Sequence, residues 1–143
     1  MPESNAVSCF IDSNVWLYAF IEGQDEDKSR IAKELIGNNR PTLSAQVINE
    51  VCVNLIRKTE VSEEEIRALI ASFYKRYIVL ELSRETLIQA SRLREQYALS
   101  YWDSQIVSSA LQSGAGVLYS EDMQDGLIVM DRLEIRNPFA EMN

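Results

Sequence analysis

Residues 7–20 read VSCFIDSNVWLYAF. The apolar run at residues 7–11 predicts a buried strand that ends at Asp12, and the apolar residues beyond it predict a helix. A similar run at residues 117–120 is followed by an acidic loop that contains Asp122. In open α/β sheets, ligand sites lie beyond the carboxyl ends of the strands. We therefore expect Asp12 and Asp122 to lie near each other at one edge of a sheet.

The length and composition are those of an ordinary globular protein, with 143 residues, 46% of them hydrophobic and 25% charged. We expect residues 1–143 to form a single domain. No apolar stretch approaches the roughly 20 residues that span a bilayer, and the first residues do not resemble a secretory signal. We therefore expect a cytoplasmic protein without a membrane segment. Cys9 and Cys52 fall at expected buried positions, which favours free thiols over a disulfide.

The chain contains no histidine and carries a net charge of −8, with a sequence pI near 4.6. The absence of histidine excludes the Ser-His-Asp and Cys-His arrangements and removes the usual general base. The acidic charge argues against tight, nonspecific binding of nucleic acid through a broad basic surface. An acidic nuclease remains possible where divalent ions in the cleft meet the phosphate.

Expected strands and helices alternate along the rest of the chain. The expected strands are residues 41–43, 79–82, 117–119 and 133–136. The expected helices begin near Asp27, Ser44, Ser62, Ser83 and Ser100. The combination at residues 37–39 suits a left-handed cap at the end of the first of these, and the apolar stripes of the helices, which include Ile56 and Leu87, are expected to face the core. This alternation predicts an α/β fold with a central parallel sheet flanked by helices.

Two further acids complete a candidate set. Glu50 lies off the apolar stripe of its helix, and Asp103 follows Ser100 at the spacing of a capping box. Each acid also has a simpler explanation, which is capping for Asp12 and Asp103, solvation for Glu50, and turn chemistry for Asp122. Carboxylates gathered in one cleft repel each other by about 4 kcal/mol per pair at about 4 Å with an effective dielectric near 20. A hard divalent cation would remove that repulsion.

The four acids, in this order, resemble the motifs of the PIN-domain ribonucleases, specifically the VapC-type toxins of bacterial and archaeal toxin–antitoxin pairs. The resemblance spans almost the whole chain and implies a PIN-like α/β fold. It rests on the segments FIDSNVWLY at 10–18, LSAQVINE at 43–50, YWDSQI at 101–106, LYSED at 118–122 and IRNPF at 135–139.

The resemblance implies four catalytic acids that hold Mg²⁺ or Mn²⁺: Asp12, Glu50, Asp103 and Asp122. These ions prefer carboxylate and water oxygens, so the residue types suit them. Four polar residues are expected to orient the carboxylates or bound waters, with helix capping as the competing explanation: Ser13, Asn14, Ser44 and Ser120. Glu121 and Asp125 lie beside Asp122, and either could share or take its role.

The function that follows is a metal-dependent endoribonuclease that leaves a 5′-phosphate and a 3′-hydroxyl, with one metal orienting hydroxide for in-line attack. The resemblance also implies a homodimer and a cognate antitoxin that blocks the cleft. Trp16 and Tyr18 look exposed and could contact the antitoxin, with core packing as the alternative for at least one. Seven basic residues on the outer sides of helices could steer RNA or meet an antitoxin, with plain solvation as the alternative: Arg57, Lys58, Lys75, Arg76, Arg84, Arg92 and Arg94.

Three other interpretations remain open. A PIN-fold nuclease could act on DNA or on structured nucleic acid, and a PIN-like module could bind without cutting. A receiver-like signalling domain is also α/β with acids at strand ends. The last fits least, because no acidic pair follows the first strand and Lys75, the last lysine, is not near a late strand end. The RNA target, the number of metal ions and the identity of the antitoxin are not determined by the sequence.

Overall fold

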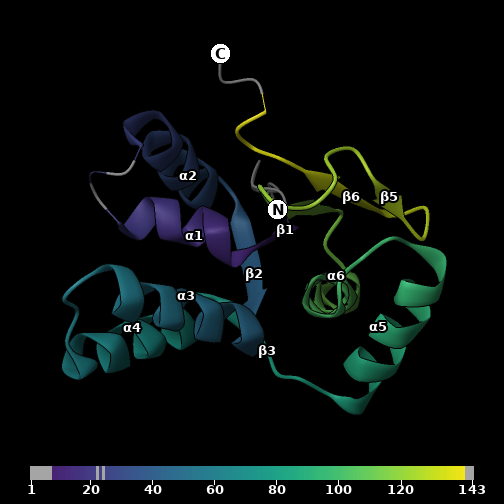
Figure 1. Ribbon diagram of the computed structural model, residues 1–143, viewed down its shortest axis with the longest axis horizontal. Helices are drawn as coiled ribbons and strands as arrows, with labels where there is room; N and C mark the ends of the chain where they lie inside the picture. Colours follow the sequence, from purple (N-terminus) through teal and green to yellow (C-terminus); the bar gives the residue numbers. More distant parts are fainter. Residues whose placement is uncertain (1–7, 22, 24, 141–143) are drawn as a thin grey trace, which may run out of the picture.

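The computed structural model of the protein describes residues 8–21, 23 and 25–140. These residues form six helices and a six-stranded sheet (Figure 1). The strands are β1 (Ser8–Ile11), β2 (Arg40–Ser44), β3 (Ile78–Leu80), β4 (Val117–Tyr119), β5 (Ile128–Val129) and β6 (Leu133–Arg136). The helices are α1 (Ser13–Phe20), α2 (Glu26–Asn38), α3 (Ala45–Lys58), α4 (Glu63–Arg76), α5 (Arg84–Gln96) and α6 (Tyr101–Ser113).

The strand order is β3-β2-β1-β4-β6-β5, and every neighbouring pair except β5 with β6 runs parallel. The expected α/β fold is therefore confirmed, with a sheet that is mixed but mostly parallel. The antiparallel strand β5 was not expected. It pairs with β6 through a turn at Met130 and Asp131, whose φ angles are 55° and 56°. Such turns usually carry Asn-Gly or Asp-Gly, so Met-Asp gives no hairpin signal in the sequence.

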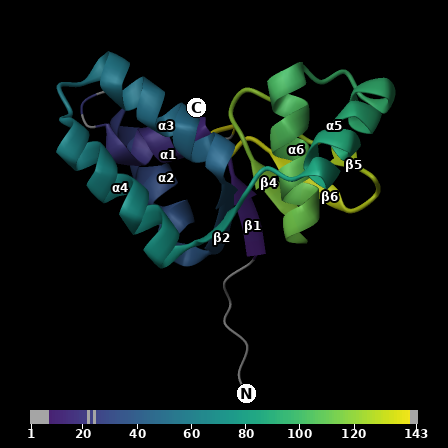
Figure 2. The same ribbon diagram turned by 90° about the horizontal axis from the view of Figure 1, so that it is seen from below.

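Helices cover both faces of the sheet. In Figure 2, α1 to α4 lie on one side of the central strands, and α5 and α6 lie on the other. The sheet contributes fully buried side chains to the core, among them Phe10, Leu118 and Ile135. Because the central strands β1 and β4 are covered on both faces, their near-continuous apolar character is what a parallel sheet requires.

Trp16 belongs to the core, which confirms core packing for at least one of the two aromatics and rules out Trp16 as an antitoxin contact. Its side chain is 1% exposed, its indole nitrogen donates to the carbonyl oxygen of Ile11 at 3.1 Å, and its ring meets Phe73 edge to face at 5.2 Å. The helix is short and apolar nearly all round, which hides from the sequence which side faces inward. Tyr18 is partly buried.

The expected N-caps at Ser44, Ser62, Ser83 and Ser100 are confirmed. The prediction of a left-handed cap at the end of α2 is wrong. Asn39 closes that helix in extended conformation, with φ −126°, and its side-chain nitrogen donates to the carbonyl oxygen of Leu35 at 2.7 Å. The amide side chain thus satisfies a terminal carbonyl that a left-handed residue would otherwise satisfy through the backbone.

Two residues expected in the core are exposed: Ile56 at 49% and Leu87 at 41%. Each belongs to an apolar stripe that is wider than the buried face of its helix. Both residues lie at the margin of the stripe, so hydrophobic periodicity predicts them to be buried although they are exposed. Strand β3 ends at Leu80, two residues earlier than expected, and begins one residue earlier, at Ile78. Cys9 and Cys52 are buried free thiols, as expected. No helix in the described ranges is long and apolar enough to cross a membrane.

Candidate active site

The carboxyl ends of β1 and β4 meet at one edge of the sheet. The two strands are parallel neighbours with Ile11 opposite Tyr119, and the backbone nitrogen of Asp12 donates to the carbonyl oxygen of Tyr119 at 3.0 Å. The hydroxyl of Ser120, the residue directly after Tyr119, donates to Oδ2 of Asp12 at 2.8 Å. The expected meeting of the two strand ends at one sheet edge is confirmed.

Asp12 is the buried member of the group, with 5% of its side chain exposed. Its Oδ1 accepts from the backbone nitrogen of Ser13 at 2.8 Å, which caps α1. Burial raises the pKa of Asp12 to about 7, although the hydrogen bonds from Ser120 and Ser13 oppose this and the charges of Glu50 and Asp103 add to it. Burial and the two neighbouring carboxylates both disfavour the charged form of Asp12, and a bound cation would favour it.

Asn14 ties Asp122 to Asp12. Its side-chain nitrogen donates to Oδ2 of Asp122 at 3.1 Å and lies 3.5 Å from Oδ2 of Asp12, and its oxygen accepts from the backbone nitrogen of Glu121 at 3.2 Å. The backbone nitrogen of Asp122 donates to the Ser120 hydroxyl at 3.3 Å. One amide and one hydroxyl therefore hold the loop after β4 against the start of α1.

Glu50 reaches the same edge from α3. Its Oε1 accepts from the hydroxyl of Ser13 at 2.9 Å, and its Oε2 accepts from the side-chain nitrogen of Gln46 at 3.0 Å. Both donors are neutral, so the carboxylate is oriented without being neutralised. The role of Gln46 was not anticipated, although its position four residues before Glu50 on a helix is the spacing that brings two side chains together.

Asp103 approaches from the first turn of α6. Its backbone nitrogen donates to the hydroxyl of Ser100 at 3.1 Å, which is one half of the expected capping box. The reciprocal bond, from the Ser100 backbone to the carboxylate, is not formed between these two described residues. Burial raises the pKa of Asp103, the Ser100 side chain opposes that, and the charges of Asp122 and Glu50 raise it further. Its carboxylate thus lies within electrostatic reach of the other acids.

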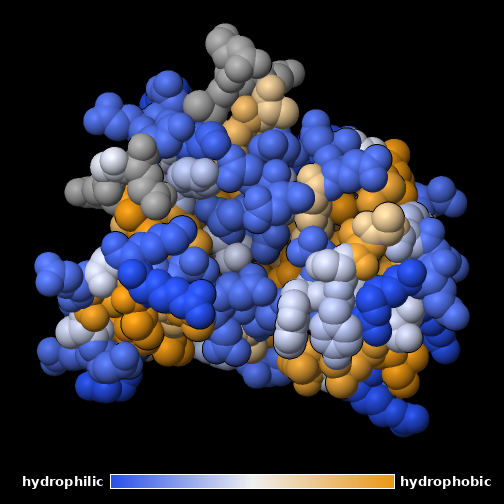
Figure 3. Space-filling model, in the orientation of Figure 1, coloured by the Kyte–Doolittle hydropathy of each residue, from blue (hydrophilic) through white to orange (hydrophobic). Residues whose placement is uncertain are grey.

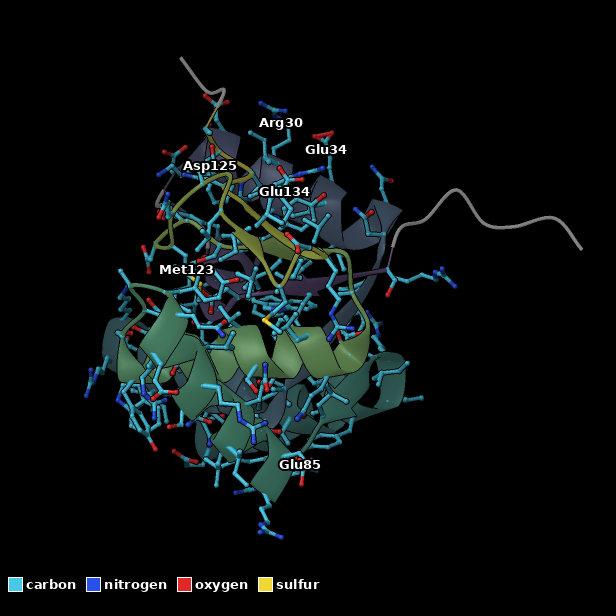
Figure 4. The ribbon with its side chains drawn as sticks, turned by 90° about the vertical axis from the view of Figure 1, so that its right-hand side faces the viewer. Arg30, Glu34, Glu85, Met123, Asp125 and Glu134 are labelled. Atoms are coloured by element: carbon cyan, nitrogen blue, oxygen red, sulfur yellow. The ribbon has the colours of Figure 1, made fainter. Side chains whose placement is uncertain are left out.

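The other two acids of the loop are engaged elsewhere. Glu121 accepts from the hydroxyl of Tyr18 at 2.9 Å and pairs with Lys28. Asp125 accepts from the backbone nitrogen of Asn137 at 2.8 Å. Met123, between them, is buried, and Figure 4 shows Asp125 further along the loop, away from the green helices.

Ser13, Asn14 and Ser120 each contact a carboxylate of the group. Ser44 is 4% exposed and caps α3 through the backbone nitrogen of Val47 at 3.4 Å. Its hydroxyl makes no hydrogen bond to the acids among the described residues. For Ser44 the capping explanation is the one that the geometry supports.

The donor set suits a hard divalent cation, although it does not form a closed cage. Within the described ranges, no three acidic or thiol side chains lie close enough together to surround one ion. Their mutual effects on pKa operate over longer distances than the roughly 2 Å of a coordination bond, so the two observations agree. An all-oxygen, open arrangement fits Mg²⁺ or Mn²⁺, since Mg²⁺ keeps several of its waters when bound.

A hollow of about 560 Å³ adjoins the acids. Its lining includes Asn14, Tyr18 and three carboxylates, Asp25, Glu121 and Asp122, together with Lys58 from the last turn of α3.

The PIN domain family model matches residues 9–126. Among solved structures, a toxin–antitoxin complex from Klebsiella pneumoniae is similar at 19% identity, with a TM-score of 0.68 over 91% of this chain and 97% of that one. VapBC2 from Rickettsia felis, bound to a promoter DNA fragment, has 18% identity and a TM-score of 0.63 over 92% and 100% of the chains. VapC20 from Mycobacterium tuberculosis, a toxin that cleaves the sarcin–ricin loop, has 16% identity and a TM-score of 0.63 over 77% and 86%. No curated protein matches the sequence.

Proposed function

The chain belongs to the PIN domain family, and we propose that it is a metal-dependent endoribonuclease, the toxin of a VapBC-type toxin–antitoxin pair. The observation that carries this proposal is the convergence of Asp12, Glu50, Asp103 and Asp122 on one sheet edge, where burial and mutual repulsion raise the pKa of Asp12 and Asp103. PIN nucleases generally use divalent metal ions, and the oxygen-only donor set suits Mg²⁺ or Mn²⁺.

The four acids would hold the metal, which when bound supplies an activated water and neutralises charge at the phosphate. Ser13 and Gln46 orient Glu50, while Ser120 and Asn14 orient Asp12 and Asp122. Lys58 attracts the phosphate backbone toward the hollow. As the family resemblance implies, water would attack the phosphorus and the bond from phosphorus to the 3′ oxygen would break, so the expected products are an RNA with a 5′-phosphate and one with a 3′-hydroxyl. The 2′-hydroxyl would take no part.

A nuclease acting on other nucleic acid is the nearest alternative, and a non-cleaving module fits less well because all four acids converge. The receiver-like interpretation is wrong. Receiver domains have the strand order 2-1-3-4-5, whereas this sheet has β3-β2-β1-β4-β6-β5.

We expect the protein to cut single-stranded RNA in Mg²⁺ or Mn²⁺ and to lose this activity when a chelator is added. The measurement is gel analysis of end-labelled RNA, with a DNA oligonucleotide of the same sequence as the control. Cutting that persists after thorough chelation contradicts the metal site. Equal cutting of DNA would support the alternative substrate.

In the same assay, Asp122→Ala should lower the cleavage rate at least about 100-fold, because even residues that only orient metal ligands commonly cost 10- to 100-fold. Asp125→Ala should retain activity and lose about 1 kcal/mol of stability with its bond to Asn137. Equal activity losses in the two variants would show that the fourth acid is misassigned.

An antitoxin partner and a homodimer complete the proposal. The fold is shared with toxin–antitoxin complexes, and an antitoxin segment could occupy the hollow beside Asp122. Expression without a partner should arrest bacterial growth, and expression of Asp103→Asn should not. Normal growth with abundant wild-type protein would argue against the toxin role. Sedimentation of the purified protein as a monomer at micromolar concentration would argue against the dimer.

A further inference from the structure

A second hollow, of about 260 Å³, lies beside the carboxylates between α3, α5 and α6. Its lining includes Trp102, Leu87, Asn49 and Gln105. The volume lies below the roughly 300–1,000 Å³ of sites for drug-sized ligands, so it suits a single flat ring system. Figure 3 shows hydrophobic side chains reaching the surface in the lower right of the view, over the region of α5 and α6.

Trp102 supplies a flat, exposed surface next to Asp103. Its side chain is 64% exposed, which is unusual for so large an apolar group. Its ring meets Tyr101 edge to face at 5.1 Å, and the guanidinium of Arg94 lies over the Tyr101 ring at 4.6 Å. Tyr101 therefore contacts the indole on one side, and Arg94 packs against Tyr101.

Gln105 supplies an unused acceptor in the wall of this hollow. The residue is 2% exposed, and its Oε1 has no hydrogen-bond partner among the described residues. Buried polar atoms without partners destabilise a folded protein, so they are few and call for an explanation. The oxygen itself is buried in the ligand-free protein, so a rotation of the side-chain amide would bring it to the hollow, where an N–H group of a ligand would satisfy it.

Gln46 connects the hollow to the active site. Its side-chain nitrogen donates both to Oε2 of Glu50, at 3.0 Å, and to the carbonyl oxygen of Trp102, at 3.3 Å. A chain with one phosphate at the carboxylates would thus have its adjoining nucleotide within reach of the indole.

We propose that this hollow binds one unpaired nucleobase of the RNA substrate, stacked on Trp102 and donating an N–H to Oε1 of Gln105. The inference rests on the proposed function and adds a position at which the nuclease holds its substrate. Every base has a flat face for the indole and an N–H on its pairing edge for Gln105, and base–aromatic stacking is the usual way in which proteins hold single strands. A paired base cannot enter, so the site selects single-stranded RNA.

Steady-state cleavage of single-stranded RNA tests the stack. Trp102→Ala should raise KM about 5- to 140-fold with kcat unchanged, because a contact made equally in ground and transition states affects binding alone. Trp102→Phe should stay much closer to wild type. Tyr74→Ala, which removes an exposed aromatic on α4, is the matched control and should change neither constant. A KM within twofold of wild type in Trp102→Ala overturns the proposal.

Gln105→Met separates ligand binding from a structural role. It removes the unpartnered oxygen at similar volume, so the melting temperature should stay equal or rise, while KM should rise about 2- to 12-fold. A lowered melting temperature with unchanged KM would show that Gln105 serves the fold alone, and would overturn its assignment.

Fluorescence tests the base without cleavage. The two tryptophans are Trp16, which is buried, and Trp102, which is exposed, so a short oligoadenylate in chelator should quench wild-type emission and leave Trp102→Phe unchanged. An abasic oligomer of equal length should not quench. If wild type cuts no RNA, the proposed function fails, and this experiment alone decides the base site. If Trp102→Ala converts a dimer into a monomer in sedimentation and leaves KM and quenching unchanged, a second copy of the chain covers the hollow and the proposal is overturned.

Discussion

Asp103→Asn should reduce RNA cleavage at least about 100-fold and raise the melting temperature of the metal-free protein. Asparagine caps a helix as well as aspartate does, and the cap at α6 uses the Ser100 hydroxyl, so the helix keeps its start. Losing the charge removes repulsion from Asp122 and Glu50. The change should also abolish most of the stabilisation that added Mn²⁺ provides, since a ligand that binds only the folded state stabilises it.

Melting curves with and without Mn²⁺ and one RNA assay measure all three effects. Ser100→Ala is the matched control, because it weakens the cap by about 1 kcal/mol and leaves the carboxylate in place. That variant should melt lower but respond to Mn²⁺ as wild type does. An active Asp103→Asn protein with a normal Mn²⁺ response would make Asp103 a helix-capping residue only.

Asp12→Asn should stabilise the metal-free protein, and the gain should grow with pH. The pKa of Asp12 in the folded protein is about 7, against an ordinary value of 3.8. Below pH 3.8 the group is protonated in both states. As pH rises toward 7, the unfolded chain releases its proton first, so the folded state loses stability relative to it. The difference of about three pKa units corresponds to up to about 4 kcal/mol above pH 7.

Denaturant unfolding of wild type and Asp12→Asn at pH 4, about 6 and about 8 measures this difference. Because asparagine does not titrate, the difference between the unfolding free energies of the two proteins at each pH reports on the ionisation of Asp12. A constant difference between Asp12→Asn and wild type from pH 4 to 8 would show that Asp12 ionises normally. The Asp12→Asn protein should also lose cleavage activity.

Most of the secondary structure follows from local patterns. Four serine N-caps and the strand ends at Ile11 and Tyr119 follow from short-range chemistry, because a cap or a turn is satisfied by residues three or four positions away. The four acids could likewise be named from their order along the chain. The alternation of strands and helices was enough to predict that β1 and β4 end at the same edge.

Contacts between distant segments settled the rest. The sequence named Asp122 as the fourth acid but left open whether Glu121 or Asp125 shares or takes its role. In the tertiary structure the three acids have different partners: Asn14 for Asp122, Tyr18 and Lys28 for Glu121, and Asn137 for Asp125. The burial of Trp16, the exposure of Trp102 and the unpaired oxygen of Gln105 are of the same kind. Which side of a helix is covered, and which polar atom finds a partner, depends on elements dozens of residues away, so no local pattern carries that information.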